Sequence, residues 1–299
     1  MDNEELKAKV IHAGEVLKVA VKLSQTYYKK PIVICYSGGK DSDVLLDIAI
    51  KTLNKKDFRV LNSHTTLDAP ETVYYIREKF AVLKAQGYTC DISYPMYKGK
   101  RDSFWKLCER RKRLPTRITR FCCASLKEIS TPHQIACVGV RSSESKNREG
   151  RDEFGLREDR TVTKTAQHVN AMIEFDQDPN NKSSFECKII KGAKKKKSMV
   201  CNPIYNFEEK DIWQYVKENN IRINPLYSKG YKRVGCVDCP MAGKKRYKEY
   251  SDYPKYRDNM IRLCNRILPN IKNNKGFLTG EDMFRWWLEE DFKQIRMDI

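Results

Sequence analysis

Strand-like segments alternate with amphipathic helix patterns in the first half of this chain, and that order predicts an α/β fold with a parallel sheet covered by helices on both faces. Two further observations support the prediction. The first strand-like run, PIVICY at 31–36, is apolar throughout, as expected of a strand buried on both faces. It ends in SGGKDS at 37–42 and passes at once into the helical pattern DVLLDIAIKTL. Ligands of such sheets bind at the carboxyl ends of the strands, so we expect a binding site at 37–42.

The remaining elements of this first half follow from local signals. A helix is expected from about Asp41 to Leu53, and a second one begins at Asp68-Ala69-Pro70-Glu71, where proline and an acid suit the first turn, and ends near Gly87. The apolar or β-branched runs between and after these helices predict strands at 58–65, 90–95 and 134–140.

Composition divides the chain into three parts. Residues 1–148 form the expected nucleotide-binding core, whereas 149–202 are polar, contain QDPNNKSS and KGAKKKK, and are predicted to be an insertion with a basic tip. Residues 203–299 are expected to hold a cysteine-containing loop and helices, among them 250–270 and 280–298, the latter with Thr279 as its N-cap.

The bulk properties limit the compartment and the partners. The 299 residues include 58 Lys and Arg against 39 Asp and Glu, a net charge of +19, which favours polyanions such as nucleic acid. No stretch approaches the roughly 18 apolar residues of a membrane-spanning helix, and the N-terminal segment is amphipathic rather than a signal peptide, so we expect a cytoplasmic protein without a membrane partner. In that compartment eleven cysteines favour metal or redox chemistry over disulfides.

The segment 37–42 is predicted to bind phosphate. Its glycines let successive N–H groups point into one concavity at the positive end of the following helix. A lysine can add a charge, serines can donate hydroxyl hydrogens, and an aspartate can position Mg²⁺. The alternative is an ordinary strand-to-helix turn that uses glycines for geometry alone. The predicted phosphate ligands are Ser37, Gly38, Gly39, Lys40, Asp41 and Ser42.

Several motifs together resemble one family. SGGKDS after a strand is similar to the pyrophosphate loop of the ATP pyrophosphatase superfamily. The segments that extend the resemblance, LDAPETVYYI, FCCASLKEI, GVRSSESKNR and the long stretch PIYNF to VDCP, lie at 67–76, 121–129, 139–148 and 203–240. The chain is thereby identified as resembling the phosphoadenosine-phosphosulfate (PAPS) reductase family. The resemblance implies an adenine-nucleotide alpha-hydrolase-like fold, with ATP and Mg²⁺ as ligands.

The cysteines form two distant pairs. Adjacent Cys122 and Cys123 are poorly placed to share one tetrahedral zinc ion, whereas an iron–sulfur cubane offers each thiolate its own iron. The family resemblance implies a [4Fe–4S] cluster on these two residues and on Cys236 and Cys239. A structural zinc ion and no metal at all are the alternatives. Three others on strand patterns, Cys35, Cys90 and Cys137, are expected in the core, and no role is assigned to Cys108, Cys187, Cys201 and Cys264.

Basic groups are expected to complete the nucleotide site. Arg141 at a strand end, and Arg148, Lys232 and Arg233, could clamp phosphate or sulfate oxygens, although solvated surface charge explains each as well. The resemblance also implies a nucleotide contact for Asp68, and helix capping is the alternative. The predicted catalytic residues are Lys40, Asp41 and Arg141.

The reaction is inferred from the intact loop. An intact loop suggests that ATP is cleaved to AMP and pyrophosphate, with an acceptor oxygen adenylated and then displaced by sulfur. No cysteine follows Cys264, which argues against the tail-cysteine mechanism of PAPS reductases. We therefore predict an ATP-dependent iron–sulfur sulfurtransferase acting on nucleic acid, with a sulfur or electron donor protein as partner. Its motifs resemble those of sulfur-activating proteins of DNA phosphorothioation systems. The alternatives are a sulfonucleotide reductase that releases sulfite, and a non-catalytic nucleotide or redox sensor that binds DNA.

Overall fold

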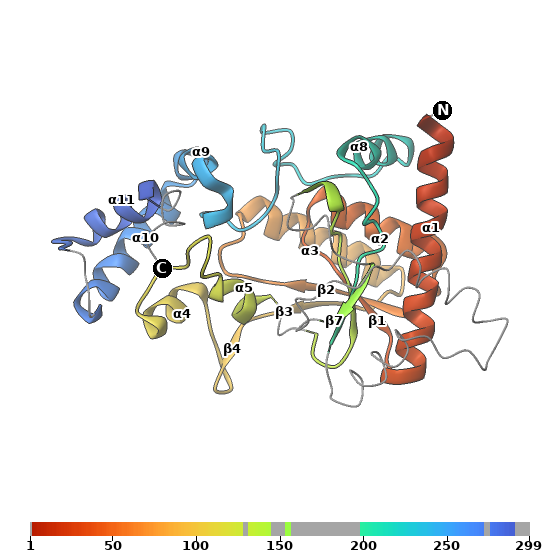
Figure 1. Ribbon diagram of the computed structural model, residues 1–299, viewed down its shortest axis with the longest axis horizontal. Helices are drawn as coiled ribbons and strands as arrows, with labels where there is room; N and C mark the ends of the chain where they lie inside the picture. The colour runs from red at the N-terminus through yellow and green to blue at the C-terminus, as the bar shows by residue number, and fades with distance from the viewer. Residues whose placement is uncertain (1, 128–130, 145–152, 157–197, 272–275, 291–299) are drawn as a thin grey trace. The chain divides into compact units, whose positions relative to one another are not determined.

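A mostly parallel six-stranded sheet forms the centre of the first of two units into which the chain divides (Figure 1). The computed structural model describes residues 2–127, 131–144, 153–156, 198–271 and 276–290. The first unit consists of Met1–Asn62, Glu71–Ile92 and Thr131–Val234, and the second of Ser63–Pro70, Ser93–Ser130 and Gly235–Ile299. Within the described residues, no helix has both the length and the apolar composition needed to cross a bilayer.

The strand order places the first strand beside the point where the topology reverses. The order is β3-β2-β1-β6-β8-β7. Strand β1 (Ile32–Cys35) pairs in parallel with β2 (Phe58–Ser63) on one side and with β6 (Ile135–Cys137) on the other. The chain moves outward from β1 through β2 to β3 (Cys90–Ser93) and then crosses back to β6. The carboxyl ends of β1 and β6 therefore border the position at which open α/β sheets bind ligands.

Two strands complete the other edge of the sheet. Strand β8 (Met199–Cys201) continues the parallel order beside β6, with Cys137 opposite Cys201, and β7 (Phe154–Leu156) runs antiparallel to β8. Both lie within the range 149–202 that was predicted to be an insertion, and the residues between them, 157–197, lie outside the described residues. The division of the chain at 148 and 202 remains a prediction.

Helices pack on this sheet through apolar faces. Helix α1 places Leu6, Ala13, Leu17 and Ala20 at helical spacing, and all four are buried. It contacts α2, which also contacts α8. The helices of the first unit are α1 (Asp2–Leu23, continued by one π turn at Ser24–Tyr28), α2 (Lys40–Thr52), α3 (Pro70–Ala85, whose first residue Pro70 belongs to the second unit) and α8 (Glu209–Glu218).

The second unit is helical with one short hairpin. Strands β4 (Met96–Tyr97) and β5 (Lys100–Arg101) pair antiparallel, and the helices pack around the buried indole of Trp287, which donates to the Pro115 carbonyl at 2.7 Å. The helices are α4 (Phe104–Arg111), α5 (Phe121–Leu126), α9 (Arg246–Asp252), α10 (Pro254–Ile267) and α11 (Gly280–Glu290). Short 3₁₀ turns of this unit occupy Pro240–Lys245 and Leu268–Asn270, and another lies in the first unit at Ser142–Glu144.

The fold class is confirmed, and the element boundaries differ in places. The helix expected over 250–270 is interrupted at Tyr253, because Pro254 has no N–H to donate and excludes the helical conformation from the residue before it. The N-cap at Thr279 is confirmed, since its hydroxyl accepts from the Asp282 N–H at 3.1 Å. The hairpin β4–β5 and the short helices α4 and α5 were not predicted.

Candidate functional site

The loop between β1 and α2 is held in an unusual backbone conformation. Gly38 has φ +74°, a region that L side chains rarely adopt, and an added Cβ would lie 2.9 Å from Cγ1 of Ile76. The buried amide of Asn224 donates to the Gly38 carbonyl at 3.0 Å and to Thr72 Oγ1 at 3.1 Å. Two other segments of the first unit, α3 and the chain after α8, therefore hold this turn in place.

The backbone N–H groups of this loop differ in their hydrogen-bond partners. Among the described residues, the N–H groups of Gly38 and Gly39 have no protein acceptor. The Ser42 hydroxyl donates to the Gly39 carbonyl at 2.7 Å and accepts from the Ser37 N–H at 3.3 Å. The Lys40 N–H donates to the Tyr227 hydroxyl at 3.0 Å. The backbone donors at the start of α2 therefore either have no protein acceptor or donate to a side-chain hydroxyl group, as expected of an anion site.

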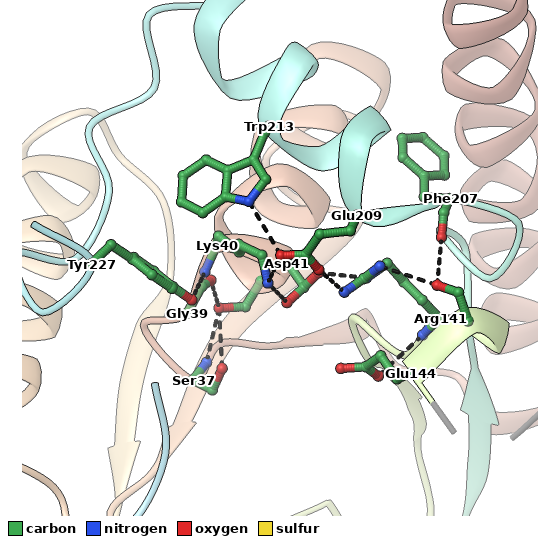
Figure 2. A network of polar contacts seen from close by, with 12 residues as sticks. Ser37, Gly39, Lys40, Asp41, Arg141, Glu144, Phe207, Glu209, Trp213 and Tyr227 are labelled. Atoms are coloured by element: carbon green, nitrogen blue, oxygen red, sulfur yellow. Dashed lines mark hydrogen bonds and ion pairs between the residues drawn. The ribbon is translucent and has the colours of Figure 1, made fainter. Parts of the chain in front are cut away.

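Two buried cations and two carboxylates meet above the loop (Figure 2). Arg141 donates from Nε to Asp41 Oδ1 at 2.6 Å and from Nη2 to Glu209 Oε2 at 2.7 Å. Lys40 Nζ lies 3.2 Å from Asp41 Oδ2 and 3.3 Å from Glu209 Oε1. Lys40 and Arg141 are only 4% and 3% exposed, so their charges need these partners.

The two positive and two negative charges of this network balance one another. Burial opposes ionisation of Glu209, but attraction to Lys40 and Arg141 outweighs it, and the pKa of Glu209 is lowered. A polyphosphate entering the loop would compete with Asp41 and Glu209 for the same two cations. Carboxylate oxygens released in this way are ligands that Mg²⁺ accepts.

Two aromatic rings border Lys40. Its Nζ lies 6.0 Å from the ring centroid of Trp213 and 5.8 Å from that of Tyr227, and these two rings meet edge to face at 5.4 Å. The Trp213 indole N–H donates to Glu209 Oε1 at 3.1 Å, which orients that carboxylate toward Lys40. Residues of α8 and of the segment after it therefore form one wall of the site.

A buried carboxyl group lies behind the loop. Asp43 is 1% exposed, and its Oδ1 accepts from the hydroxyls of Tyr36 at 2.6 Å and Tyr75 at 2.9 Å. Burial raises the pKa of Asp43 to about 6 despite these two bonds. The single hydroxyl hydrogen of Tyr75 is shared with the Arg222 carbonyl oxygen, 2.6 Å away. The group therefore joins the end of β1, α2, α3 and the segment after α8.

The two cysteine pairs lie together in the second unit. Cys122 and Cys123 occupy the first turn of α5. The Cys122 thiol donates to Cys123, and this bond, burial and the charges on Cys123, Cys236 and Cys239 all raise the pKa of Cys122. The same bond and the neighbouring Arg120 lower the pKa of Cys123. All four thiols are thus within electrostatic reach of one another.

The loop that carries the second pair is firmly anchored. Cys236 donates to Thr65 Oγ1 at 3.3 Å, and the next N–H, of Val237, donates to the Leu67 carbonyl at 2.7 Å. Asp238 has φ +67°, and its N–H donates to Glu249 at 2.7 Å. A positive φ at the centre of CxxC turns the chain sharply between Cys236 and Cys239.

The donor set fits a [4Fe–4S] cluster chemically, since four cysteine thiolates are its usual ligands. Within the ranges that the structure describes, no group of three or more His, Cys, Asp or Glu side chains has the geometry of a preformed metal site. The chemistry of the residues, rather than their geometry, supports the cluster.

A comparison with protein families shows to which family this chain belongs. A family model for the phosphoadenosine phosphosulfate reductase domain matches residues 31–242, which include the loop, the Arg141 network and both cysteine pairs. The chain belongs to the phosphoadenosine phosphosulfate reductase family. This confirms the resemblance inferred from the motifs.

The relatives of this family member include an uncharacterized protein and a named reductase. An uncharacterized protein of Methanocaldococcus jannaschii is 24% identical over 281 residues, covering 89% of this chain and 48% of that protein. An adenosine 5'-phosphosulfate reductase of Lysinibacillus sphaericus is 25% identical over 224 residues, covering 73% of this chain and 77% of that enzyme. The chain spans about half the length of the two Methanocaldococcus jannaschii relatives, 48% and 47%.

The comparison with solved structures found matches of low sequence identity. The phosphoadenylyl-sulfate reductase of Candida auris, in a phosphate complex, has a TM-score of 0.45 at 19% identity and covers 76% of this chain and 89% of its own. The U34-tRNA thiolase NcsA of Methanococcus maripaludis, solved with its [4Fe–4S] cluster, has a TM-score of 0.40 at 12% identity and covers 95% of this chain and 81% of its own.

The structure brings together some of the predicted site residues of this family member. The six loop residues and Arg141 lie in the first unit, with Arg141 bound directly to Asp41. Asp68 lies in the second unit, where its carboxylate accepts from the Thr65 N–H at 2.8 Å and its backbone pairs with Cys236. Arg233 is exposed and forms no ion pair within the described part of the chain, and Arg148 lies outside the described residues.

The prediction missed four residues that hold the loop and its network. They lie in the segment 203–240, which contributes to the family resemblance, but no residue in it was chosen as a site candidate apart from the basic and cysteine positions. Their partners are 68 to 187 positions away along the chain or within α8 itself, so only the fold reveals them. These residues are Glu209, Trp213, Asn224 and Tyr227.

Proposed function

We propose that this chain is an ATP-dependent sulfurtransferase that adenylates an oxygen of a nucleic acid acceptor. The observation that supports this most is the intact loop. Among the described residues its Gly38 and Gly39 N–H groups have no acceptor, and the adjacent Lys40 and Asp41 side chains form a network with Arg141. This arrangement suits a polyphosphate with its metal ion better than it suits a neutral ligand, because donors and cations gather at one helix start.

The residues divide into three roles. The loop N–H groups would bind phosphate oxygens, and Lys40 and Arg141 would stabilise charge on the departing pyrophosphate. Asp41 and Glu209 would exchange these cations for Mg²⁺. Tyr227 would release the Lys40 N–H as a phosphate oxygen replaces its hydroxyl.

The reaction balances with a named sulfur source. The acceptor oxygen attacks the α-phosphorus of ATP, its bond to phosphorus forms, and pyrophosphate leaves. A hydrosulfide ion then attacks the activated carbon or phosphorus of the acceptor, the new bond to sulfur forms, and AMP leaves with the original oxygen. Adenylation makes this oxygen a good leaving group, which is the reason to use ATP.

The cysteine site is the second part of the proposal. Cys122, Cys123, Cys236 and Cys239 would hold a [4Fe–4S] cluster through their thiolates. When bound, such a cluster supplies electron transfer or a place to hold sulfur. Arg120, whose guanidinium donates to Cys123 Sγ at 3.4 Å, favours the thiolate that any such metal centre needs.

A second candidate is a sulfonucleotide reductase. The family membership and the 25% identical adenosine 5'-phosphosulfate reductase support this alternative. In that case the loop would bind the phosphate of a preformed sulfonucleotide, sulfite would be released, and ATP would not be consumed.

One assay separates these functions. The protein is purified without oxygen, its iron and sulfide are measured, and ATP, adenylylsulfate and PAPS are each scored for pyrophosphate, AMP and sulfite. Pyrophosphate from ATP that is lost in Lys40→Met supports the proposal. The matched control is Lys51→Met on the exposed face of α2, which should keep the activity. Sulfite without ATP consumption supports the reductase, and tight ATP binding without turnover identifies a sensor.

A further inference from the structure

One surface of the second unit carries an unusual density of positive charge. Residues 97–120 contain ten Lys and Arg against two acidic residues. Eight of these cations are exposed and form no ion pair among the described residues: Lys98, Lys100, Arg101, Lys106, Arg111, Lys112, Arg113 and Arg120. We call the exposed part of 94–120 the basic hairpin–helix surface.

The acidic residues of this surface do not neutralise it. Asp102 is held by Arg110, which donates to it from Nη1 at 2.9 Å and from Nη2, and the pKa of Asp102 is lowered as a result. Glu109 pairs with Arg266 of α10. Both carboxylates are therefore engaged, and the remaining cations keep an uncompensated field that attracts polyanions.

Aromatic side chains are interleaved with these cations. The Arg110 guanidinium stacks on the Tyr97 ring at 3.8 Å, and that of Arg101 stacks on Tyr94 at 4.0 Å. Tyr97 and Met96 remain 45% and 54% exposed at the tip of the hairpin, which projects beyond helix α4 in Figure 1. The stacking of Arg110 on Tyr97 joins hairpin and helix into one continuous surface.

The surface extends to the first cysteine pair. At the end of α4, the Arg113 guanidinium lies 5.5 Å from the ring centroid of Phe121, the residue before Cys122. Seven residues further along, Arg120 donates to Cys123 Sγ at 3.4 Å. A polyanion bound along this surface would therefore end beside the thiols.

Favourable interaction with the dipole of α4 explains only part of the charge. Arg110 and Arg111 lie in the last turn of that helix, where cations are favourable. Lys98 and Lys100 lie in the hairpin, where no helix end accounts for them. Both Lys98 and Lys112 also have positive φ values, 47° and 52°, in turns where asparagine or glycine would be easier to accommodate.

We propose that the basic hairpin–helix surface binds a single-stranded segment of nucleic acid and directs it to Cys122 and Cys123. The inference rests on the proposed function, because it supplies the binding site for the nucleic acid acceptor. Cations spaced along the surface contact successive phosphates, and the exposed Tyr97 ring stacks on an unpaired base. A duplex has no unpaired base to offer, so the single strand is the preferred ligand.

The test compares two variants of the full chain with equal charge change. The surface variant carries Lys98→Asn, Lys100→Ser, Arg111→Gln and Lys112→Asn. The control carries Lys7→Gln, Lys18→Gln, Lys29→Asn and Lys56→Ser, exposed positions of the first unit, again with asparagine where φ is positive. Binding of a labelled mixed-sequence single strand of about 20 nucleotides, long enough to exceed a typical site, is measured by anisotropy over a salt series.

Three results are expected. The surface variant binds at least about tenfold more weakly than the control, and the slope of log K against log salt falls by up to about 3, since each single-strand phosphate contact contributes about 0.7. Tyr97→Leu weakens single-strand binding roughly 5- to 150-fold at unchanged salt slope. If the fourfold surface variant does not fold, as judged by circular dichroism, Lys98→Asn with Lys100→Ser in the exposed hairpin is compared with Lys29→Asn with Lys56→Ser.

Other outcomes overturn the inference. Equal weakening in surface and control variants means that net charge alone binds the strand. Tighter binding of the matching duplex, with no effect of Tyr97→Leu, excludes single-strand recognition, and absence of oligonucleotide binding by the wild type at low salt excludes the surface altogether. ATP binding of the wild type is measured separately. If it fails, the proposed function fails, while the two variants still decide this inference.

Discussion

Gly38 offers the sharpest test of the loop geometry. Its φ of +74° places it in the left-handed region, and the position of an added Cβ is 2.9 Å from Ile76 Cγ1, 3.1 Å from Ile76 Cδ1 and 3.3 Å from Thr72 Cγ2. The perturbation is Gly38→Ala, which adds one methyl group to the loop. Neither the backbone nor the buried side chain of Ile76 can yield freely, because Asn224 ties the Gly38 carbonyl to Thr72.

The expected loss of folding stability in Gly38→Ala has two contributions. Holding a residue with a Cβ in the left-handed region costs about 1–2 kcal/mol. Forcing a methyl group into a packed contact costs typically about 1–3 kcal/mol. We therefore expect Gly38→Ala to lower the free energy of unfolding by about 2–5 kcal/mol and to abolish ATP binding in the protein that remains folded.

Gly39→Ala is the matched control. Gly39 has φ −97°, and its added Cβ would meet nothing nearer than the Tyr227 hydroxyl at 3.5 Å. We expect the free energy of unfolding to change by less than about 1 kcal/mol, because Gly39 is buried but its added Cβ would make only ordinary contacts. Nucleotide affinity should still fall, because the new methyl group lies next to an N–H that would bind phosphate.

Guanidinium denaturation and binding of a fluorescent ATP analogue are measured for both variants. Ile76→Val removes Cδ1, one of the two clashing atoms, so the cost of Gly38→Ala should be smaller in that background by about 0.5 kcal/mol or more. Equal stability of Gly38→Ala and the wild type, or full additivity with Ile76→Val, would refute the loop conformation described above.

Three further predictions concern other groups. The unfolded pKa of Asp43 is near 3.8 and the folded pKa about 6, so the stabilisation present below pH 3.8 is lost as pH rises through 6. Asp43→Asn cannot ionise, and its unfolding free energy relative to the wild type should rise by about 1.4 kcal/mol from pH 5 to pH 8; a constant difference contradicts a buried ionisable group. Tyr227→Phe removes the acceptor of the Lys40 N–H and should cost about 0.5–1.5 kcal/mol without ATP but nothing at saturating Mg-ATP, and an equal loss in both conditions argues against displacement by phosphate. Cys236→Ser should lose most iron and sulfide after anaerobic purification, whereas Cys264→Ala in α10 should retain them; equal iron in both excludes the cluster ligand.

Local signals were enough to predict four strands of the sheet and the glycine-containing turn between β1 and α2, but not β7 and β8. An apolar run followed by SGGKDS identifies a strand end and a helix start, because glycines, helix-starting residues and the two periodicities act over a few residues. The paired cysteines were likewise visible as CC and CxxC. Even here tertiary context shifted boundaries, as at Pro254.

Tertiary packing determines which residues contact the loop between β1 and α2. Asp41 and Arg141 are 100 residues apart, yet β1 and β6 are neighbours in the sheet, so their strand ends meet. Glu209 and Tyr227 reach the loop because α8 packs on α2 and the chain after it returns to Gly39. Such contacts depend on which apolar faces bury one another, a choice made by the whole core rather than by any short stretch of residues.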